Sequence, residues 1–393
     1  MHSRVCGYRT VYTLDGDGKV WFSGHYLSED EEWRRVSTPT VLGEEIPAIL
    51  SMCDAHRRHY FIDVDGGVWY TGHEYNGTLK IVVTPRALSF PVPIKDVAAS
   101  WDICVFLSVD GELWMESIPH TNGFSPHMPL QLSGVKVKSV KAGLYKLVFL
   151  DVDGCIWTVK NLTEETWEKY EHSCRVVDVY AGYCKIVIHD EENMVWQSGP
   201  NGRLGLGHIP QPPGFHKMHE NPIKMVSVSE NHAIMLDFNE QVWTSSYYEH
   251  AQIGEKSHFQ KSVRLINIPP IQMICAGNGH NLLLDHNGVV WAYGKNQAGQ
   301  LGLGDLKERK HCTKIRSLPP IQSVWASYRH QTFFSMFLDL EGSIWMCGEN
   351  KYGELGLGDE ICRMKPVKTC FPKIEIFRKQ KNVKSAKEVV ILE

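Results

Sequence analysis

The chain lacks the charge balance and the cysteine patterns of several common protein classes. Its 393 residues carry a formal net charge of −4, and its pI is near 6.5. General attraction to nucleic-acid phosphates needs a basic surface, so we expect no direct contact with nucleic acid. The eleven cysteines include no C-x-x-C pair, which argues against a zinc knuckle or a thioredoxin-like redox site. We therefore expect no metal and no other cofactor.

Signals for secretion and for membrane attachment are also missing. No signal peptide follows Met1, no long apolar run occurs, and the last residues, Val390–Glu393, carry no prenylation cysteine. Together with the odd number of cysteines, these absences favour a reduced, soluble, intracellular protein in the cytoplasm or nucleus, without membrane contact.

Catalytic motifs are scarce as well. The Gly-Leu-Gly stretches lack the Gly-Lys-Ser/Thr ending of a P-loop and the helix of a dinucleotide fingerprint. The segments Asp15–Gly18, Asp63–Gly66 and Asp151–Gly154 resemble the start of a calcium loop, but no glutamate follows at loop position twelve, so we interpret them as hairpin turns. No nucleophile and base form a recognisable set, so an enzyme of the hydrolase or oxidoreductase type is not predicted.

What the chain does contain is a repeat. Eight times, a Val, Ile or Leu precedes a tryptophan that stands three residues after a turn-forming position. The spacings of 39 to 54 residues are typical of propellers and solenoids. These motif tryptophans are Trp21, Trp69, Trp114, Trp157, Trp196, Trp243, Trp291 and Trp345.

The clearest copy, residues 270–305 and the strand that follows, predicts four short strands. Alternating apolar residues at 271–274, an apolar run at 280–284, a turn at 285–288 and the tryptophan strand at 290–294 precede a fourth strand near 312–315. Four such antiparallel strands make one propeller blade. The turn contains Asn287-Gly288, a pair that readily adopts the positive φ angle of tight hairpins.

Two landmarks recur in the other copies. Glycine stands three residues before the tryptophan in six of eight copies, and a pair of mostly small residues precedes the second strand. In the eighth copy four extra residues are interpreted as a bulge or longer hairpin within Phe333 to Asp339. His232, His280 and His330 are assigned to one repeat position, where we predict that they bond backbone between blades rather than bind a metal.

These motifs resemble the regulator of chromosome condensation repeat. The resemblance covers residues 5 to about 375 and is strongest at three loops of the Gly-x-Leu-Gly-Leu-Gly type, Gly202–His208, Gly299–Asp305 and Gly353–Asp359. It implies an all-β fold, a single β-propeller of four-stranded blades. The family usually has seven blades, whereas eight tryptophan strands are present here, so seven or eight blades remain open.

We predict one monomeric propeller over residues 1–375 and a basic segment with closing strands over 376–393. The resemblance implies that strands from the two chain termini close the ring. Asn382–Leu392 has the alternation of such strands and would complete the blade begun by Val11–Phe22.

The variable turns between the small pair and the second strand should lie together on one rim of the propeller. In the family's founding member, the nucleotide exchange factor of the GTPase Ran, this rim engages the GTPase. The partner-binding candidates here are His56, Arg57, Asp102, Glu230 and Arg329.

Two functions follow from the resemblance: a protein-interaction scaffold that could hold a small GTPase, or a guanine nucleotide exchange factor for a Ran-like GTPase. The founding member's β-wedge insertion and basic N-terminal arm have no recognisable equivalent, which favours the scaffold.

Overall fold

The computed structural model describes residues 4–6, 10–27, 33–43, 45–54, 58–75, 79–100, 103–117, 128–130, 135–143, 147–161, 166–170, 172–182, 186–198, 214–229, 232–246, 263–327 and 332–374. Every element of regular secondary structure within these ranges is a β-strand. Accordingly, no helix in the described part of the chain could cross a membrane.

The first four blades use the strands β1 to β16. They are β1 (Arg4–Cys6), β2 (Thr10–Leu14), β3 (Val20–Leu27) and β4 (Trp33–Val41); β5 (Ile49–Asp54), β6 (Arg58–Asp63), β7 (Val68–Tyr75) and β8 (Leu79–Leu88); β9 (Ile94–Ala99), β10 (Ile103–Ser108), β11 (Leu113–Ser117) and β12 (Met128–Leu130); and β13 (Val137–Ala142), β14 (Leu147–Asp151), β15 (Ile156–Asn161) and β16 (Thr166–Tyr170).

The last four blades use β17 to β32. They are β17 (Val176–Ala181), β18 (Ile186–Asp190), β19 (Val195–Ser198) and β20 (His216–Lys217); β21 (Ile223–Val228), β22 (His232–Asp237), β23 (Val242–Ser246) and β24 (Val263–Arg264); β25 (Ile271–Ala276), β26 (His280–Asp285), β27 (Val290–Gly294) and β28 (Arg309–Lys314); and β29 (Ile321–Ala326), β30 (Phe334–Asp339), β31 (Ile344–Gly348) and β32 (Arg363–Lys368).

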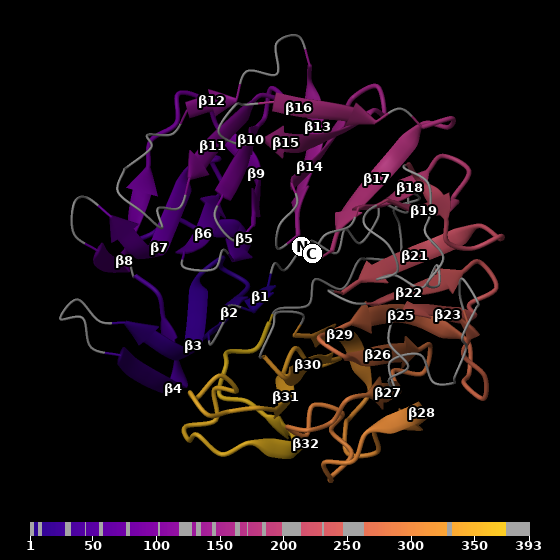
Figure 1. The fold of residues 1–393 in the computed structure, drawn as a ribbon. Helices are drawn as coiled ribbons and strands as arrows, with labels where there is room; N and C mark the ends of the chain where they lie inside the picture. Colours follow the sequence, from indigo (N-terminus) through magenta and orange to yellow (C-terminus); the bar gives the residue numbers. More distant parts are fainter. Residues whose placement is uncertain are drawn as a thin grey trace, which may run out of the picture.

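Each blade is a four-stranded antiparallel sheet of consecutive strands, and the eight sheets surround a common axis (Figure 1). This confirms the all-β propeller and decides the blade number in favour of eight. The prediction for the clearest repeat is confirmed strand by strand, because β25 to β28 cover the four segments expected there.

A tight turn joins the second and third strands of every blade, and its geometry explains the recurring glycine. Gly66, at the last turn position of the second blade, has a φ of 81°. Asn193 and Glu240 occupy the same position in the fifth and sixth blades with φ angles of 62° and 61°. Glycine adopts this conformation without the steric cost that a side chain brings, so six of the eight copies use it.

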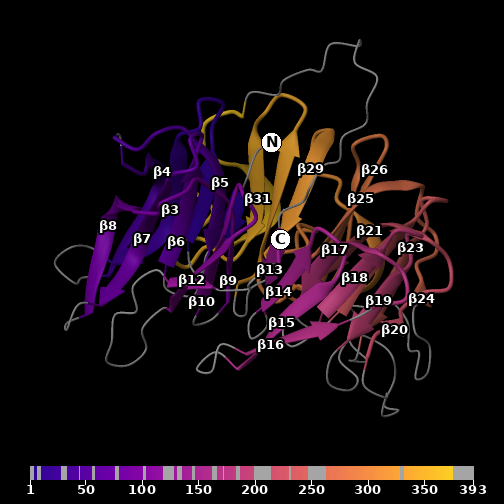
Figure 2. The ribbon, with the colours of Figure 1, turned by 90° about the horizontal axis from the view of Figure 1, so that it is seen from above.

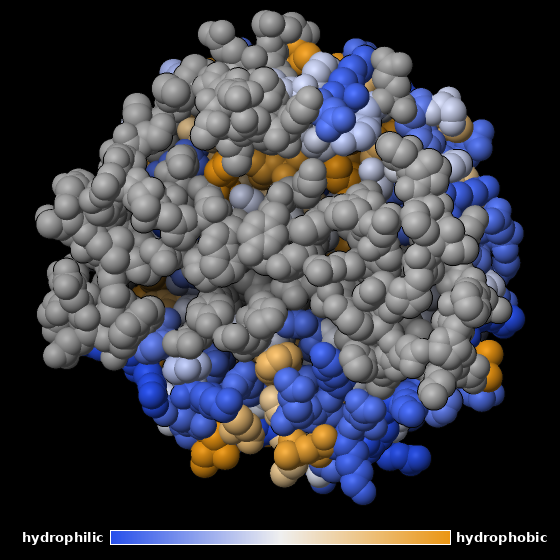
Figure 3. Space-filling view, in the orientation of Figure 1, coloured by the Kyte–Doolittle hydropathy of each residue, from blue (hydrophilic) through white to orange (hydrophobic). Residues whose placement is uncertain are grey.

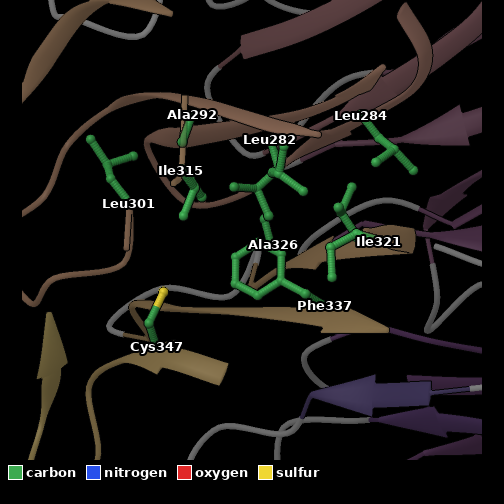
Figure 4. Close-up of a cluster of buried hydrophobic side chains, with 11 residues drawn as sticks. Leu282, Leu284, Ala292, Leu301, Ile315, Ile321, Ala326, Phe337 and Cys347 are labelled. Carbon is green, nitrogen blue, oxygen red and sulfur yellow. The ribbon is translucent and has the colours of Figure 1, made fainter. Parts of the chain in front are cut away.

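The apolar core lies between the blades. Eight clusters of buried side chains each join one blade to the next, and the motif tryptophan of the following blade packs against each cluster. Figure 4 shows the cluster between the seventh and eighth blades, where Leu282 and Leu284 meet Ile321 and Phe337. The tryptophans therefore have a structural role.

The eighth and first blades are in contact, as the indigo and yellow strands of Figures 1 and 2 show. Val11 joins Phe334 in one apolar cluster. The Ser23 hydroxyl donates a hydrogen bond of 2.8 Å to the Glu354 carbonyl. The expected closing segment, 382–392, lies outside the described residues, and the first blade already has four strands from residues 4–41.

Two expectations for the eighth blade are wrong. Its hairpin, Asp339–Gly342, has the same length as that of the seventh blade, Asp285–Gly288, so the four extra residues precede β30 instead of lying within it. Phe334 pairs with Gly348 as His280 pairs with Gly294. Phe334 therefore occupies the repeat position that was assigned to His330.

Candidate functional site

The five predicted partner-binding residues, His56, Arg57, Asp102, Glu230 and Arg329, lie outside the described residues. The strand ends that flank them are described: each candidate falls between the first and second strands of its blade, in the second, third, sixth and eighth blades. The strands alternate in direction in the same order in every blade. These strand ends therefore face one side of the ring, opposite the tight hairpins, and we call that side the rim.

The seventh blade shows how a rim turn is held. The Asn278 backbone N–H donates a hydrogen bond of 2.7 Å to the carbonyl of Ser327 in the eighth blade. The Lys295 N–H, where the connection to the fourth strand begins, donates to the Gly279 carbonyl at 2.8 Å. This turn is thus tied both to the neighbouring blade and to the adjacent connection.

A charged network is buried between the second and third blades, next in sequence to the candidate Arg57. Arg58 begins β6 and is 1% exposed, and its partner Glu116, near the end of β11, is 3% exposed. The Arg58 guanidinium donates to the Glu116 carboxylate. The Tyr60 hydroxyl donates to the other carboxylate oxygen at 2.8 Å. The guanidinium carbon also lies 4.9 Å from the centroid of the Tyr70 ring.

The surroundings keep this network charged. Burial opposes the positive charge of Arg58, but Tyr60 and Glu116 outweigh it and raise the arginine pKa above its ordinary value. Burial also raises the pKa of Tyr60, so its hydroxyl stays protonated and can donate to the carboxylate. A buried charge is stable only when it is paired and hydrogen-bonded, so the pair fixes the start of β6 against the end of β11.

Between the later blades the same strand position uses neutral groups. His232 Nε2 lies 2.7 Å from Asn281 Oδ1 in the seventh blade, and His280 Nε2 lies 3.0 Å from Ser335 Oγ in the eighth. Burial lowers the pKa of His232 to about 4 and that of His280 to about 3. The predicted structural role of His232 and His280 is correct, although their Nε2 atoms contact side chains of the neighbouring blade and not its backbone.

The hairpin face carries a second repeated contact, which sequence reasoning missed. In seven blades an aspartate stands six residues before the motif tryptophan, and its carboxylate accepts the indole N–H. At Asp63, one oxygen accepts backbone N–H groups of Asp65 and Gly67 at 3.0 and 2.7 Å, and the other accepts Trp69 Nε1 at 2.9 Å. The calcium-like segments are therefore hairpin turns, as predicted, and the constant spacing of six residues was the available signal.

The Gly-Leu-Gly loops of the last two blades connect the third strand of each blade to the fourth. Asn296 and Asn350 each bridge their loop through an amide that donates to a carbonyl nine residues later, at 2.8 and 2.9 Å. In the orientation of Figure 1, the described surface over these blades is largely hydrophilic, with a few apolar side chains (Figure 3).

A family profile matches two segments of the chain. Residues 287–333 and 341–385 match the Regulator of chromosome condensation (RCC1) repeat. These segments cover the seventh and eighth tryptophan motifs.

Two curated proteins are similar over parts of the chain. The Ultraviolet-B receptor UVR8 of Arabidopsis thaliana is 26% identical over 212 residues, which are 51% of this chain and 47% of the receptor. The probable E3 ubiquitin-protein ligase HERC4 of Homo sapiens is 42% identical over 77 residues, which are 19% of this chain and 7% of the ligase. The matches thus span about half of one relative and a small part of the other.

Solved structures share the fold over most of the chain. One is the crystal structure of Prp20p from Saccharomyces cerevisiae, which was described together with its binding to Gsp1p and histones. The match has a TM-score of 0.58 at 18% identity, and it covers 88% of this chain and 82% of the Prp20p chain. Human WBSCR16 has a TM-score of 0.59 at 15% identity, with 86% of each chain covered. At these identities the likeness concerns the fold alone.

Proposed function

We propose that this eight-bladed propeller, in which residues 287–333 and 341–385 match the RCC1 repeat, is a protein-interaction scaffold whose rim binds a protein partner. The observation that carries the proposal is the repetition of one strand order in all eight sheets. That order directs the variable turns of different blades to one side of a rigid ring. Binding residues commonly stand on such loops, held by a rigid scaffold.

The proposed binding side chains are His56, Arg57, Asp102, Glu230 and Arg329. Arginine is enriched in the cores of protein interfaces, and charges on one face can steer a partner and fix its orientation. The buried Arg58–Glu116 pair supports this choice, since it holds the strand that directly follows Arg57. We propose that the protein acts as a soluble monomer in the cytoplasm or nucleus, without contact with nucleic acid or membrane.

A Ran-like small GTPase is the partner we favour, and nucleotide exchange on it is the alternative function. The likeness to Prp20p, a protein described as binding Gsp1p, supports both. As an exchange factor, the propeller would bind the nucleotide-free GTPase more tightly than the nucleotide-bound form, and only that difference would accelerate release. As a scaffold, it would bind without such a preference.

Capture experiments with rim variants test the proposal. Immobilised full-length protein should retain a partner from cell lysate, and Asp102→Ala with Glu230→Ala should weaken retention without changing thermal stability. Glu308→Lys, a charge reversal at an exposed residue of the Gly-Leu-Gly connection, is the matched control and should bind normally. The proposal fails if the rim variant binds normally while the control does not.

A nucleotide-release assay separates the two functions. Purified Ran loaded with a fluorescent guanine nucleotide is mixed with catalytic amounts of the protein. Accelerated release that Asp102→Ala reduces would establish exchange activity. Binding to Ran without acceleration would leave the scaffold function alone.

A further inference from the structure

Three side chains with metal-binding chemistry meet where the fourth blade joins the fifth. His172 and Cys174 lie on the short connection between β16 and β17, and Asp190 ends β18. Their potential ligand atoms all lie within 4.8 Å of one another. In the described part of the chain, this is the one group of three such residues within that distance. We infer that His172, Cys174 and Asp190 form a zinc-binding site.

The set of donors matches zinc in type and number. Imidazole, thiolate and carboxylate are all zinc ligands, at about 2.0–2.3 Å from the ion, and a thiolate favours zinc over the harder magnesium and calcium ions. Ligand atoms around one tetrahedral ion lie roughly 3.3–3.8 Å apart at those bond lengths. The three atoms therefore need to approach by about 1.5 Å or less, and water would occupy the fourth position. Binding converts the Cys174 thiol to a thiolate, and the released proton goes to solvent.

The carboxylate is already oriented by the fold. Asp190 is 0% exposed, and one of its oxygens accepts the Glu192 and Met194 backbone N–H groups at 3.0 and 2.8 Å. The other oxygen accepts Trp196 Nε1 at 2.7 Å. Each carboxylate oxygen has two lone pairs, so this second oxygen can also bind an ion. Hydrogen bonds of this kind commonly fix metal-binding carboxylates.

The histidine ring is also held in place. Its centroid lies 4.7 Å from that of Trp196 with the ring planes at 70°. Its Nδ1 lies 3.2 Å from both the backbone N and the carbonyl O of Cys174. His172 and Cys174 are both half-buried, so the group lies close to solvent and an ion can enter.

The sixth blade provides an internal comparison without the thiol. His219 packs on Trp243 with ring centroids 4.2 Å apart, and Asp237 accepts the Trp243 indole N–H at 3.0 Å. His219 stands four residues before β21 as His172 stands four before β17, but Asn221 replaces the cysteine. In the third blade Phe90 packs on Trp114 at 6.0 Å. Ring packing alone therefore explains an aromatic residue at this position, and Cys174 is the addition that makes a three-ligand site.

Zinc and cobalt titrations of the full-length protein test the inference. Wild type should bind one equivalent of Zn²⁺ in competition with a chromogenic chelator. Bound Co²⁺ should show a thiolate-to-cobalt charge-transfer band in the near ultraviolet. Cys174→Ser should abolish the band. His172→Phe, which keeps a ring on Trp196 as Phe90 does on Trp114, should weaken Zn²⁺ binding by more than the roughly 10–100-fold that loss of an outer hydrogen-bond partner costs.

Matched variants decide whether the effect is specific. Cys362→Ser removes an exposed cysteine elsewhere, and His219→Phe removes the histidine of the comparison blade; both should bind Zn²⁺ and Co²⁺ as wild type does. The inference is wrong if wild type binds no Zn²⁺, or if Cys174→Ser keeps both the affinity and the charge-transfer band. Rim binding and nucleotide release are separate measurements, so this outcome is independent of the proposed function.

Discussion

The third and seventh blades have the same four strands and the same tryptophan position, but different polar contacts support them. In the seventh blade Asp285 accepts two backbone N–H groups and the Trp291 indole N–H. In the third blade Ser108 stands in its place and, among the described residues, its hydroxyl accepts the Glu112 N–H alone, at 2.9 Å. Trp114 Nε1 is buried there and has no hydrogen-bond partner among the described residues.

The polar contact at one interface of each blade also differs. Glu116 of the third blade pairs with the charged Arg58 of the second blade. His280 of the seventh blade makes a neutral contact with Ser335 of the eighth. The shape of the repeat is thus kept while the chemistry of its polar contacts varies. We conclude that tryptophan packing and the hairpin turn define the blade, and that polar pairs adjust each interface separately.

The largest expected effect is at the charged contact of the third blade. Glu116→Ala leaves the Arg58 guanidinium buried without a counter-charge, which should lower the free energy of unfolding by about 3–5 kcal/mol. Urea unfolding followed by tryptophan fluorescence measures this. The double variant Arg58→Met with Glu116→Leu should recover most of the loss, because apolar side chains of similar size can replace a buried ion pair. A Glu116→Ala protein as stable as wild type would contradict the buried-pair interpretation.

Tryptophan replacements compare the two blades directly. Trp291→Ala removes a large side chain from the interface between the sixth and seventh blades, at a cost of roughly 3–5 kcal/mol. Trp114→Ala should lower the free energy of unfolding by about 1 kcal/mol less, because the Trp114 indole N–H has no hydrogen bond to lose in the described structure. Equal unfolding free energies for wild type and Trp291→Ala, combined with loss of a bound partner, would instead make the tryptophans surface anchors.

Low pH should destabilise the fold at the neutral contact between His280 and Ser335. Burial lowers the pKa of His280 from its ordinary value of 6.5 to about 3. As the pH decreases, the unfolded chain therefore binds the proton before the folded protein does. The contribution of His280 to the free energy of unfolding is complete above pH 6.5 and falls as the pH decreases toward 3. At about pH 5 the expected decrease in the free energy of unfolding is roughly 2 kcal/mol.

A variant of the same histidine isolates this contribution. His280→Gln keeps a hydrogen-bonding group toward Ser335 but does not titrate. Its unfolding free energy should therefore fall less than that of wild type between roughly pH 7.5 and pH 5. Equal losses in the two proteins would show that His280 does not set the acid sensitivity.

The sequence predicted the blades well because every blade repeats one local pattern. Glycine or its substitutes at the turn, and a tryptophan three residues later, fixed strands such as β26 and β27 within one residue. Contacts between blades were not predictable in the same way. Arg58 and Glu116 are 58 residues apart, and no local spacing joins them. The aspartate six residues before the tryptophan was visible in the sequence. The sequence did not show that one carboxylate oxygen accepts backbone N–H groups while the other accepts the indole N–H.

The smallest expected effect converts the third blade to the chemistry of the seventh. In Ser108→Asp the new carboxylate can accept the Asp110 and Glu112 backbone N–H groups and the Trp114 indole N–H, as Asp285 does for its own hairpin. Giving a buried donor its partner should raise the free energy of unfolding by about 0.5–1.5 kcal/mol. The exposed carboxylates of Asp110 and Glu112 repel the new charge, but solvent keeps that cost small. Urea unfolding measures the gain, and slower hydrogen exchange of the Trp114 indole N–H locates it. A stability equal to wild type with unchanged indole exchange would show that the third blade does not use the carboxylate as the other seven do.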